Sequence, residues 1–184
     1  MTYGTFVIYL HLHIFFIFIF ATGKTSNYPE LALLVSCIDD AVNPAEAVSV
    51  GVGDRLPAFA VTLGDGTVVS DQTLLGAPAM IVFFNTTCPD CRRELPVVEQ
   101  FYRRHGQHCR VVAIAREQLR DDIAAYWAAN SLTLPYSPQP DRAVFNLFAT
   151  ERIPRIYQVN SQGIITAAYD DTHLPTLDEL EQAQ

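Results

Sequence analysis

AMIVFFNTTCPDCRRELP, residues 79–96, runs from six consecutive apolar residues through two cysteines into a helix-forming stretch. The run 79–84 has no polar position, which is typical of a central strand that is buried on both faces. Pro89 suits the first turn of a helix, so we expect a helix to begin there. Cys88 and Cys91 therefore lie at a strand-to-helix junction. Two thiols three positions apart at such a junction can form and break a disulfide without moving the backbone.

Elements on both sides of this junction predict an α/β domain. Upstream, GDG at residues 64–66 joins two short strands into a hairpin. Downstream we expect a buried strand at 110–115, a helix at 121–130, a proline-broken loop at 135–140 and a short helix that ends at 148. NSQG at 160–163 joins two antiparallel strands, and a capping box of Thr176 and Glu179 begins a last helix. This order predicts a central mixed β-sheet with helices on both faces.

The size and charge of the chain limit its function. Its 184 residues are enough for one domain with a hydrophobic core plus an N-terminal tail. The formal net charge is −8 and no block of lysine or arginine is present to neutralise phosphates, which argues against nucleic-acid binding. One basic cluster is interpreted as a solvated helix face: Arg92, Arg93, Arg103 and Arg104.

The chain has four cysteines, and their spacing does not indicate a structural metal site. No second CxxC pair and no cysteine–histidine set with zinc-finger spacing is present, so we expect no metal. Cys109 precedes an apolar run and is interpreted as a small buried hydrophobe, with a second redox role as the alternative.

The N-terminal part of the sequence predicts attachment to a membrane. Residues 6–21 are almost continuously apolar, and we assign residues 1–23 to a membrane-targeting or anchor segment. Residues 24–52 are interpreted as a tether, and residues 53–184 as the folded domain. We expect this domain to lie in the cell envelope, outside the cytoplasm, in a periplasmic or surface-exposed position.

The tether contains a second feature that points to the membrane. Leu34-Val35-Ser36-Cys37 resembles the lipobox of bacterial lipoproteins, in which the signal is cleaved before a lipidated cysteine. Pro29-Glu30 shortens the apolar stretch in front of it. Lipidation of Cys37 and anchoring by residues 6–21 therefore both stay open.

The stretch from Asn85 to Pro96 resembles the active site of the membrane-anchored, thioredoxin-like thiol–disulfide oxidoreductases of the TlpA/ResA type. The shared pattern is C-x-x-C-x-x-E-x-P, and the similarity in the order of elements runs from about Gly53 to the C-terminus. The resemblance implies a thioredoxin-like fold with an N-terminal β-hairpin and a β/α insertion. It also implies that the protein exchanges dithiols and disulfides.

The chemistry of the two cysteines agrees with this resemblance. Free N–H groups and the helix dipole favour a thiolate at Cys88, which would attack a substrate disulfide. Cys91, one turn on, would resolve the mixed disulfide. Glu94 shares the helix face of Cys91, and in the resembling family this glutamate tunes the cysteines and assists proton transfer. The alternatives are a structural disulfide and an exposed helix carboxylate.

Five residues around the cysteines are expected to bind substrate: Thr87, Pro89, Asp90, Ile153 and Pro154. The resemblance implies a cis peptide bond before Pro154, which would make Ile153 face Cys88 and let its backbone pair with a substrate strand. The alternative is a proline at the first residue of a strand. The family usually has an aromatic residue before the first cysteine, where this chain has Thr87.

We therefore predict an extracytoplasmic thiol–disulfide oxidoreductase that most resembles reductases of protein disulfides. We expect a monomer without a cofactor that receives electrons from a membrane donor. Its substrate stays open among an apocytochrome, another envelope protein and a small disulfide.

Three other functions are considered. A copper-binding chaperone on the same fold needs three residues between its cysteines and a ligating histidine, for which His173 is the only candidate. A non-catalytic binding module does not need the intact Cys88, Cys91 and Glu94. A peroxidase of the peroxiredoxin kind needs a proline and a threonine that residues 85–87 do not supply at the required offsets.

Overall fold

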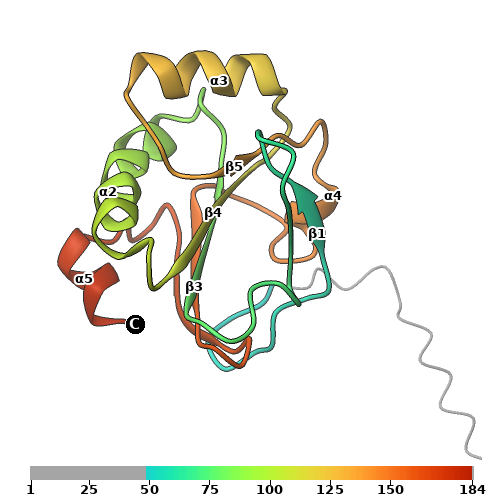
Figure 1. Cartoon of the computed structure of the whole chain (residues 1–184), viewed down its shortest axis with the longest axis vertical. Helices are drawn as coiled ribbons and strands as arrows, with labels where there is room; N and C mark the ends of the chain where they lie inside the picture. Colours follow the sequence, from blue (N-terminus) through green and yellow to red (C-terminus); the bar gives the residue numbers. More distant parts are fainter. Residues whose placement is uncertain (1–48, 184) are drawn as a thin grey trace, which may run out of the picture. The chain divides into compact units, whose positions relative to one another are not determined.

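A five-stranded mixed sheet forms the centre of the computed structural model, which describes residues 49–183 (Figure 1). The strand order is β5-β4-β3-β6-β7. These strands are β3 (Ala79–Phe84), β4 (Arg110–Ala115), β5 (Tyr136–Ser137), β6 (Arg155–Val159) and β7 (Ile165–Tyr169). A separate hairpin pairs β1 (Ala60–Thr62) with β2 (Val68–Ser70), and the helices are α2 (Pro89–His105), α3 (Arg120–Ala129), α4 (Ala143–Asn146) and α5 (Leu177–Gln182).

Strand β3 is the buried axis of the sheet. It pairs with β4 in parallel on one side and with β6 antiparallel on the other, and all six of its side chains are buried. Neighbouring side chains on a strand point to opposite faces. Phe83 accordingly packs on Phe145 and Phe148, at ring-centroid distances of 5.4 and 4.9 Å, while Phe84 packs on Trp127 at 5.0 Å.

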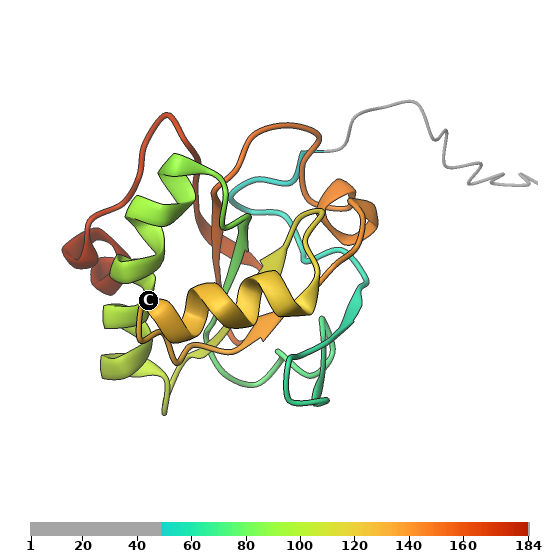
Figure 2. The same cartoon turned by 90° about the horizontal axis from the view of Figure 1, so that it is seen from above.

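The helices cover both faces of the sheet, as the sequence predicted. The parallel connections β3–α2–β4 and β4–α3–β5 are of the kind that is almost always right-handed, which places α2 and α3 on one face. Arg92 of α2 lies over the ring of Tyr126 of α3, and α5 packs beside α2 (Figures 1 and 2). The short helix α4 contributes Phe145 to the other face. The predicted fold class, with its N-terminal hairpin and β/α insertion, is confirmed.

One predicted loop contains a strand. Residues 135–140 were expected to be irregular because of their prolines, but Tyr136 and Ser137 form β5 along the free edge of β4. The carbonyl of Pro135 accepts a hydrogen bond from Ala113 N at 2.9 Å. A proline at the start of a short edge strand removes no donor that the ladder needs, so it does not prevent the pairing.

Much of the predicted N-terminal tail lies outside the described residues. This applies to the membrane segment 1–23, to the lipobox 34–37 with Cys37, and to most of the tether. At the beginning of the described part, Val50 N donates to the carbonyl of Phe148 at 2.9 Å. Across residues 49–183, every helix is too short or too polar to span a bilayer.

A buried carboxylate joins α2 to the segment that leads into β5. Glu99 is 5 % exposed and accepts hydrogen bonds from Thr133 N and Leu134 N, at 2.8 and 2.9 Å. The Thr133 hydroxyl and Arg103 Nε also donate to it, both at 2.6 Å. Burial alone would raise the pKa of Glu99, but these hydrogen bonds lower it below the usual value. Glu99 therefore fixes the active-site helix to the neighbouring loop as an anion.

Replacing this anion should destabilise the fold. We expect Glu99→Gln to lower the free energy of unfolding by about 2 kcal/mol at pH 7, because the buried donors lose a charged acceptor. Since the native pKa is depressed, this contribution is present above about pH 4.5 and is lost as the pH falls below it. Urea unfolding of both proteins at pH 7 and pH 3.5 measures the difference.

Glu181→Gln is the matched control. Glu181 also pairs with an arginine, Arg104, but the pair is exposed, so the unfolding midpoint should stay close to that of the wild type. A Glu99→Gln protein as stable as this control at pH 7 would contradict the role given to Glu99.

Candidate active site

Cys88 and Cys91 lie where β3 ends and α2 begins. Cys88 is the N-cap of α2, with extended backbone angles of φ −77° and ψ 122°, and its sulfur accepts a hydrogen bond from Cys91 N at 3.5 Å. Cys88 is half-buried, whereas Cys91 is 0 % exposed. A helix N-terminus stabilises negative charge on a capping sulfur. Cys88 is therefore the sulfur that a partner protein can reach, and Cys91 lies behind it.

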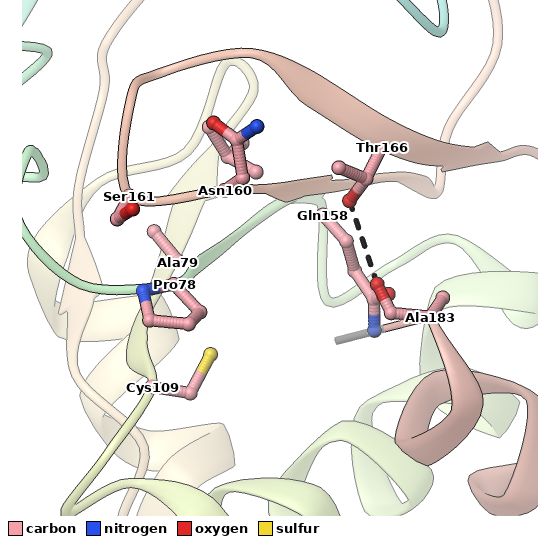
Figure 3. A pocket seen from close by; sticks show the side chains of 9 residues that line it. Pro78, Ala79, Cys109, Gln158, Asn160, Ser161, Thr166 and Ala183 are labelled. Carbon is pink, nitrogen blue, oxygen red and sulfur yellow. Dashed lines mark hydrogen bonds between the residues drawn. The ribbon is translucent and has the colours of Figure 1, made fainter.

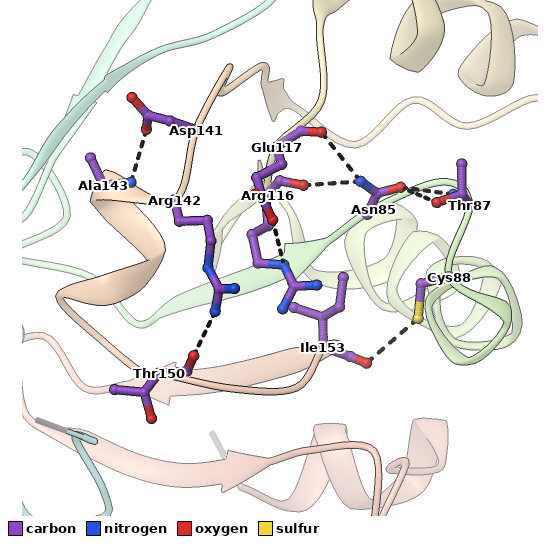
Figure 4. Close-up of polar contacts among 10 residues, drawn as sticks. All are labelled: Asn85, Thr87, Cys88, Arg116, Glu117, Asp141, Arg142, Ala143, Thr150 and Ile153. Carbon is purple, nitrogen blue, oxygen red and sulfur yellow. Dashed lines mark hydrogen bonds and ion pairs between the residues drawn. The ribbon is translucent and has the colours of Figure 1, made fainter. Parts of the chain in front are cut away.

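The segment before β6 faces Cys88. The Ile153–Pro154 peptide bond is cis, as the family resemblance implies. The carbonyl of Ile153 accepts a hydrogen bond from the Cys88 thiol at 3.5 Å (Figure 4). Two segments 65 residues apart in the sequence thus meet at the Cys88 sulfur.

The loop between β3 and Cys88 is held by two polar side chains that the sequence analysis did not identify. Asn85 Oδ1 accepts from the Thr87 backbone and hydroxyl at 2.9 and 2.8 Å, and Asn85 Nδ2 donates to the Arg116 carbonyl at 3.0 Å (Figure 4). Gln118 accepts from Thr86 N at 2.9 Å and also donates to the Thr86 hydroxyl. Polar residues directly after two parallel strands were the signal that could have indicated this network.

Cys91 is held as a thiol by its surroundings. Burial is the main cause that raises the pKa of Cys91 far above its usual value. A backbone hydrogen bond from Asn85 and the positive charge of Arg116 act in the opposite direction. Cys91 must therefore lose a proton before it can act as a nucleophile.

Glu94 is buried one helical turn after Cys91. Glu94 is 3 % exposed, and its Oε1 atom has no hydrogen-bond partner in the described part of the chain. Burial raises the pKa of Glu94 to about 7, with Arg93 opposing the shift and Glu179 adding to it. This burial excludes the exposed helix carboxylate that was the alternative. A carboxyl group with this pKa can accept a proton near neutral pH.

The predicted substrate-binding residues surround Cys88. Thr87 and Pro89 are exposed on either side of it, and Ile153 and Pro154 are buried opposite. Asp90 forms an ion pair with Arg93 at 2.5 Å, so the positive charge of Arg93 offsets much of the negative charge of Asp90 beside the two cysteines. Contact of these five residues with substrate stays a prediction.

His173 and Cys109 do not join this site. His173 is exposed and its Nε2 lies 2.9 Å from Glu179 Oε1. Within residues 49–183 no group of three or more histidine, cysteine or acidic side chains is arranged to hold a metal ion.

Cys109 lies just before β4, at the end of the parallel strands opposite to the end where Cys88 lies. It lines a cavity of about 150 Å³ together with Pro78, Ala79 and Gln158 (Figure 3). Burial raises the pKa of Cys109 to about 11, so it is mostly a thiol at neutral pH.

Comparisons with known proteins identify relatives of the whole described domain. The sequence model of the AhpC/TSA family matches residues 52–168. Thioredoxin-like protein YneN of Bacillus subtilis (strain 168) is 25% identical over 142 residues, which cover 74% of this chain and 79% of YneN. Thiol-disulfide oxidoreductase ResA of the same organism is 20% identical over 125 residues, which cover 67% of this chain and 70% of ResA.

A solved structure shows the same fold. The thiol:disulfide interchange protein of the thioredoxin family from Chlorobium tepidum TLS has a TM-score of 0.62 and 19% sequence identity, over 74% of this chain and 96% of that chain. The expected thioredoxin-like fold is thereby confirmed. The matched range of the family model includes both cysteines, Glu94 and the Ile153–Pro154 segment.

Burial of Glu94 predicts an unusual dependence of stability on pH. Because its pKa is raised in the folded protein, the native state binds this proton more tightly than the unfolded state. Stability should therefore fall as the pH rises from about 4.5 to about 7. The loss attributable to Glu94 is at most about 3 kcal/mol, from 1.36 kcal/mol per pKa unit.

The matched variant is Glu94→Gln, which has the same shape and no proton to release. We expect the difference in unfolding free energy between this variant and the wild type to grow in favour of the variant from pH 4.5 to pH 7.5. Urea unfolding of the reduced proteins measures it. A constant difference across this range would show that Glu94 is not the buried acid described above.

Proposed function

We propose that this chain, which belongs to the AhpC/TSA family, is a thiol–disulfide oxidoreductase that reduces protein disulfides through Cys88 and Cys91. The observation that carries the proposal is the position of Cys88, half-buried at a helix N-terminus and facing the cis-proline segment. The relatives named as thiol-disulfide oxidoreductases support it.

The reaction proceeds in two exchanges. The Cys88 thiolate attacks one sulfur of the substrate disulfide, and the other substrate sulfur leaves as a thiolate that takes a proton. Cys91 then attacks the sulfur of Cys88, which releases the second substrate thiol and leaves a Cys88–Cys91 disulfide. Two electrons pass from the dithiol to the substrate, and a dithiol donor at the membrane restores the reduced form.

Glu94 accepts the proton that Cys91 loses in the second exchange. Cys91 is fully buried and its pKa is raised by that burial, so it cannot ionise into water. Glu94 has an oxygen without a partner among residues 49–183, on the same buried side of the helix. As a carboxylate it takes the proton as Cys91 attacks, and burial makes the protonated acid the favoured product.

Substrate binding uses the Ile153 backbone. In the free protein its carbonyl accepts a hydrogen bond from the Cys88 thiol. When Cys88 ionises, this hydrogen bond is lost and the carbonyl becomes available to an N–H of an extended substrate segment. Thr87 and Pro89 form the exposed rim on the other side of the sulfur.

Insulin reduction tests this proposal. With dithiothreitol as electron source, the full chain should precipitate the insulin B chain, and Cys88→Ser should reduce the rate at least about a hundredfold because it removes the nucleophile. Cys91→Ser should instead accumulate a mixed disulfide with the substrate that mass spectrometry detects.

Cys109→Ser is the matched control, since Cys109 is a buried cysteine at the opposite edge of the sheet. It should retain most of the activity. Insulin reduction by Cys88→Ser at the wild-type rate would refute the site.

We place the domain outside the cytoplasm and attached to a membrane. This part of the proposal is supported by the apolar segment 6–21 and the lipobox-like residues 34–37. A reductase in this position would serve envelope proteins, with an apocytochrome among the substrates to be tested.

The location is tested by protease treatment of intact spheroplasts that express the full chain. We expect the domain to be digested while a cytoplasmic marker survives. Labelling with radioactive palmitate separates the anchors, because Cys37→Ala abolishes the label only if Cys37 is lipidated. A domain protected until the membrane is lysed would contradict the proposed location.

A further inference from the structure

Two arginines share one aromatic ring close to the active site. Arg116 follows β4 and Arg142 precedes α4, and their guanidinium carbons lie 5.3 and 5.5 Å from the centroid of the Phe145 ring. Phe145 is 1 % exposed, so it gives both side chains a rigid support. Stacking on a ring face leaves the edges of a guanidinium free to donate hydrogen bonds.

The charges of this pair are poorly balanced within the described residues. Arg142 has no carboxylate within 4 Å there, and it donates to the Thr150 carbonyl at 2.5 Å. The neighbouring Asp141 instead accepts from Ala143 N. Arg116 has Glu117 at 3.7 Å, but its Nε atom is buried without a hydrogen-bond acceptor.

Two arginines close to Ile153 in the chain, unlike Arg142, each have a carboxylate within 4 Å. Arg152 lies 3.6 Å from Asp171, and Arg155 lies 3.4 Å from Asp170. In a chain of net charge −8, Arg142 is a local exception, because no carboxylate of the described residues lies within 4 Å of it, and its neighbour Arg116 has only the exposed Glu117, at 3.7 Å. Such a pair is suited to bind an anion from outside the chain.

The pair is connected to the segments that meet at Cys88, because Arg142 donates to the carbonyl of Thr150, which lies shortly before Ile153 in the chain. Figure 4 shows Arg142, Arg116, Ile153 and Cys88 in succession across the view. The Arg116 backbone is joined to the active-site loop by Asn85, and its charge acts on Cys91 against the effect of burial. We therefore expect a substrate segment that pairs with Ile153 to pass close to both guanidinium groups.

We propose that Arg116 and Arg142 select protein disulfides that carry an aspartate or glutamate close to the reactive cysteine. This inference rests on the proposed reductase function and names its substrate class. Guanidinium groups bind carboxylates with paired, directed hydrogen bonds. Alternate side chains of an extended segment point the same way, so an acidic residue two positions from the cysteine lies on the side of its sulfur.

Trapping experiments with peptide disulfides test the inference. The full chain with Cys91→Ser is mixed with disulfide-linked peptides that differ only in glutamate, glutamine or lysine two positions before or after the cysteine. Mass spectrometry follows the mixed disulfide with Cys88. Each rate is divided by the rate of reduction of the same peptide by dithiothreitol, which removes the intrinsic reactivity of the peptide.

In at least one of the two positions we expect the glutamate peptide to be trapped about tenfold faster than the glutamine peptide at low salt, and the lysine peptide more slowly. The preference should fall as salt is added. Arg142→Gln or Arg116→Gln in the trapping protein should reduce the glutamate-to-glutamine ratio to about twofold or less.

Arg110→Gln is the matched control. Arg110 also donates to backbone carbonyls, those of Thr73 and Leu75, but it begins β4 at the edge away from Cys88. Its replacement should leave the ratio unchanged, and circular dichroism checks the folding of each variant.

The outcomes separate the two proposals. Equal trapping of all three peptides, or a preference that survives Arg142→Gln and Arg116→Gln, overturns the selection by charge and leaves the reductase intact. No trapping of any peptide, together with no reduction of insulin, overturns the reductase and the inference with it.

Discussion

Antiparallel pairing between β3 and β6 sets the geometry on which the site depends. Phe83 pairs with Arg155, so the end of β3 lies beside the beginning of β6. Cys88 follows Phe83 by five positions and Ile153 precedes Arg155 by two, which brings the thiol against the carbonyl. A slip of one residue would turn every β3 side chain to the opposite face. The continuous burial of β3 prevents such a slip, because Phe83 and Phe84 fill different sides of the core.

The difference in burial gives the two cysteines different roles in the proposed reaction. Cys88 is partly accessible at the tip of α2, whereas Cys91 and Glu94 face the core from the same helix. The dry environment that keeps Cys91 protonated also raises the pKa of Glu94 to about 7. The thiol and the base of the proposed resolving step are thus tuned by one physical cause. A substrate meets only the outer sulfur, and the inner one acts once a mixed disulfide has formed.

Local patterns predicted those parts of the structure that depend on local chemistry. The bounds of β3 follow from an uninterrupted apolar run, most of β4 follows from the apolar run after Arg110, and the helix start follows from Pro89. The burial of Glu94 follows from its spacing of three from Cys91. Strand β5 was missed because its two residues are ordered by the edge of β4 and not by their own sequence. The network of Asn85 and Gln118 and the contact of Arg116 with Phe145 join segments about 30 residues apart, which no local pattern reports.

Charge acts on substrates at two ranges. The net charge of −8 repels an acidic protein at long distance, but salt screens that repulsion beyond about 8–10 Å. Arg116 and Arg142 act inside this distance, on a partner already in contact with the Ile153 segment. A substrate that satisfies both conditions is neutral or basic as a whole and acidic beside its cysteine. Thr87, in the place where the resembling family has an aromatic residue, offers little apolar contact area to a partner. Selection by charge beside the disulfide therefore carries more of the specificity in this chain.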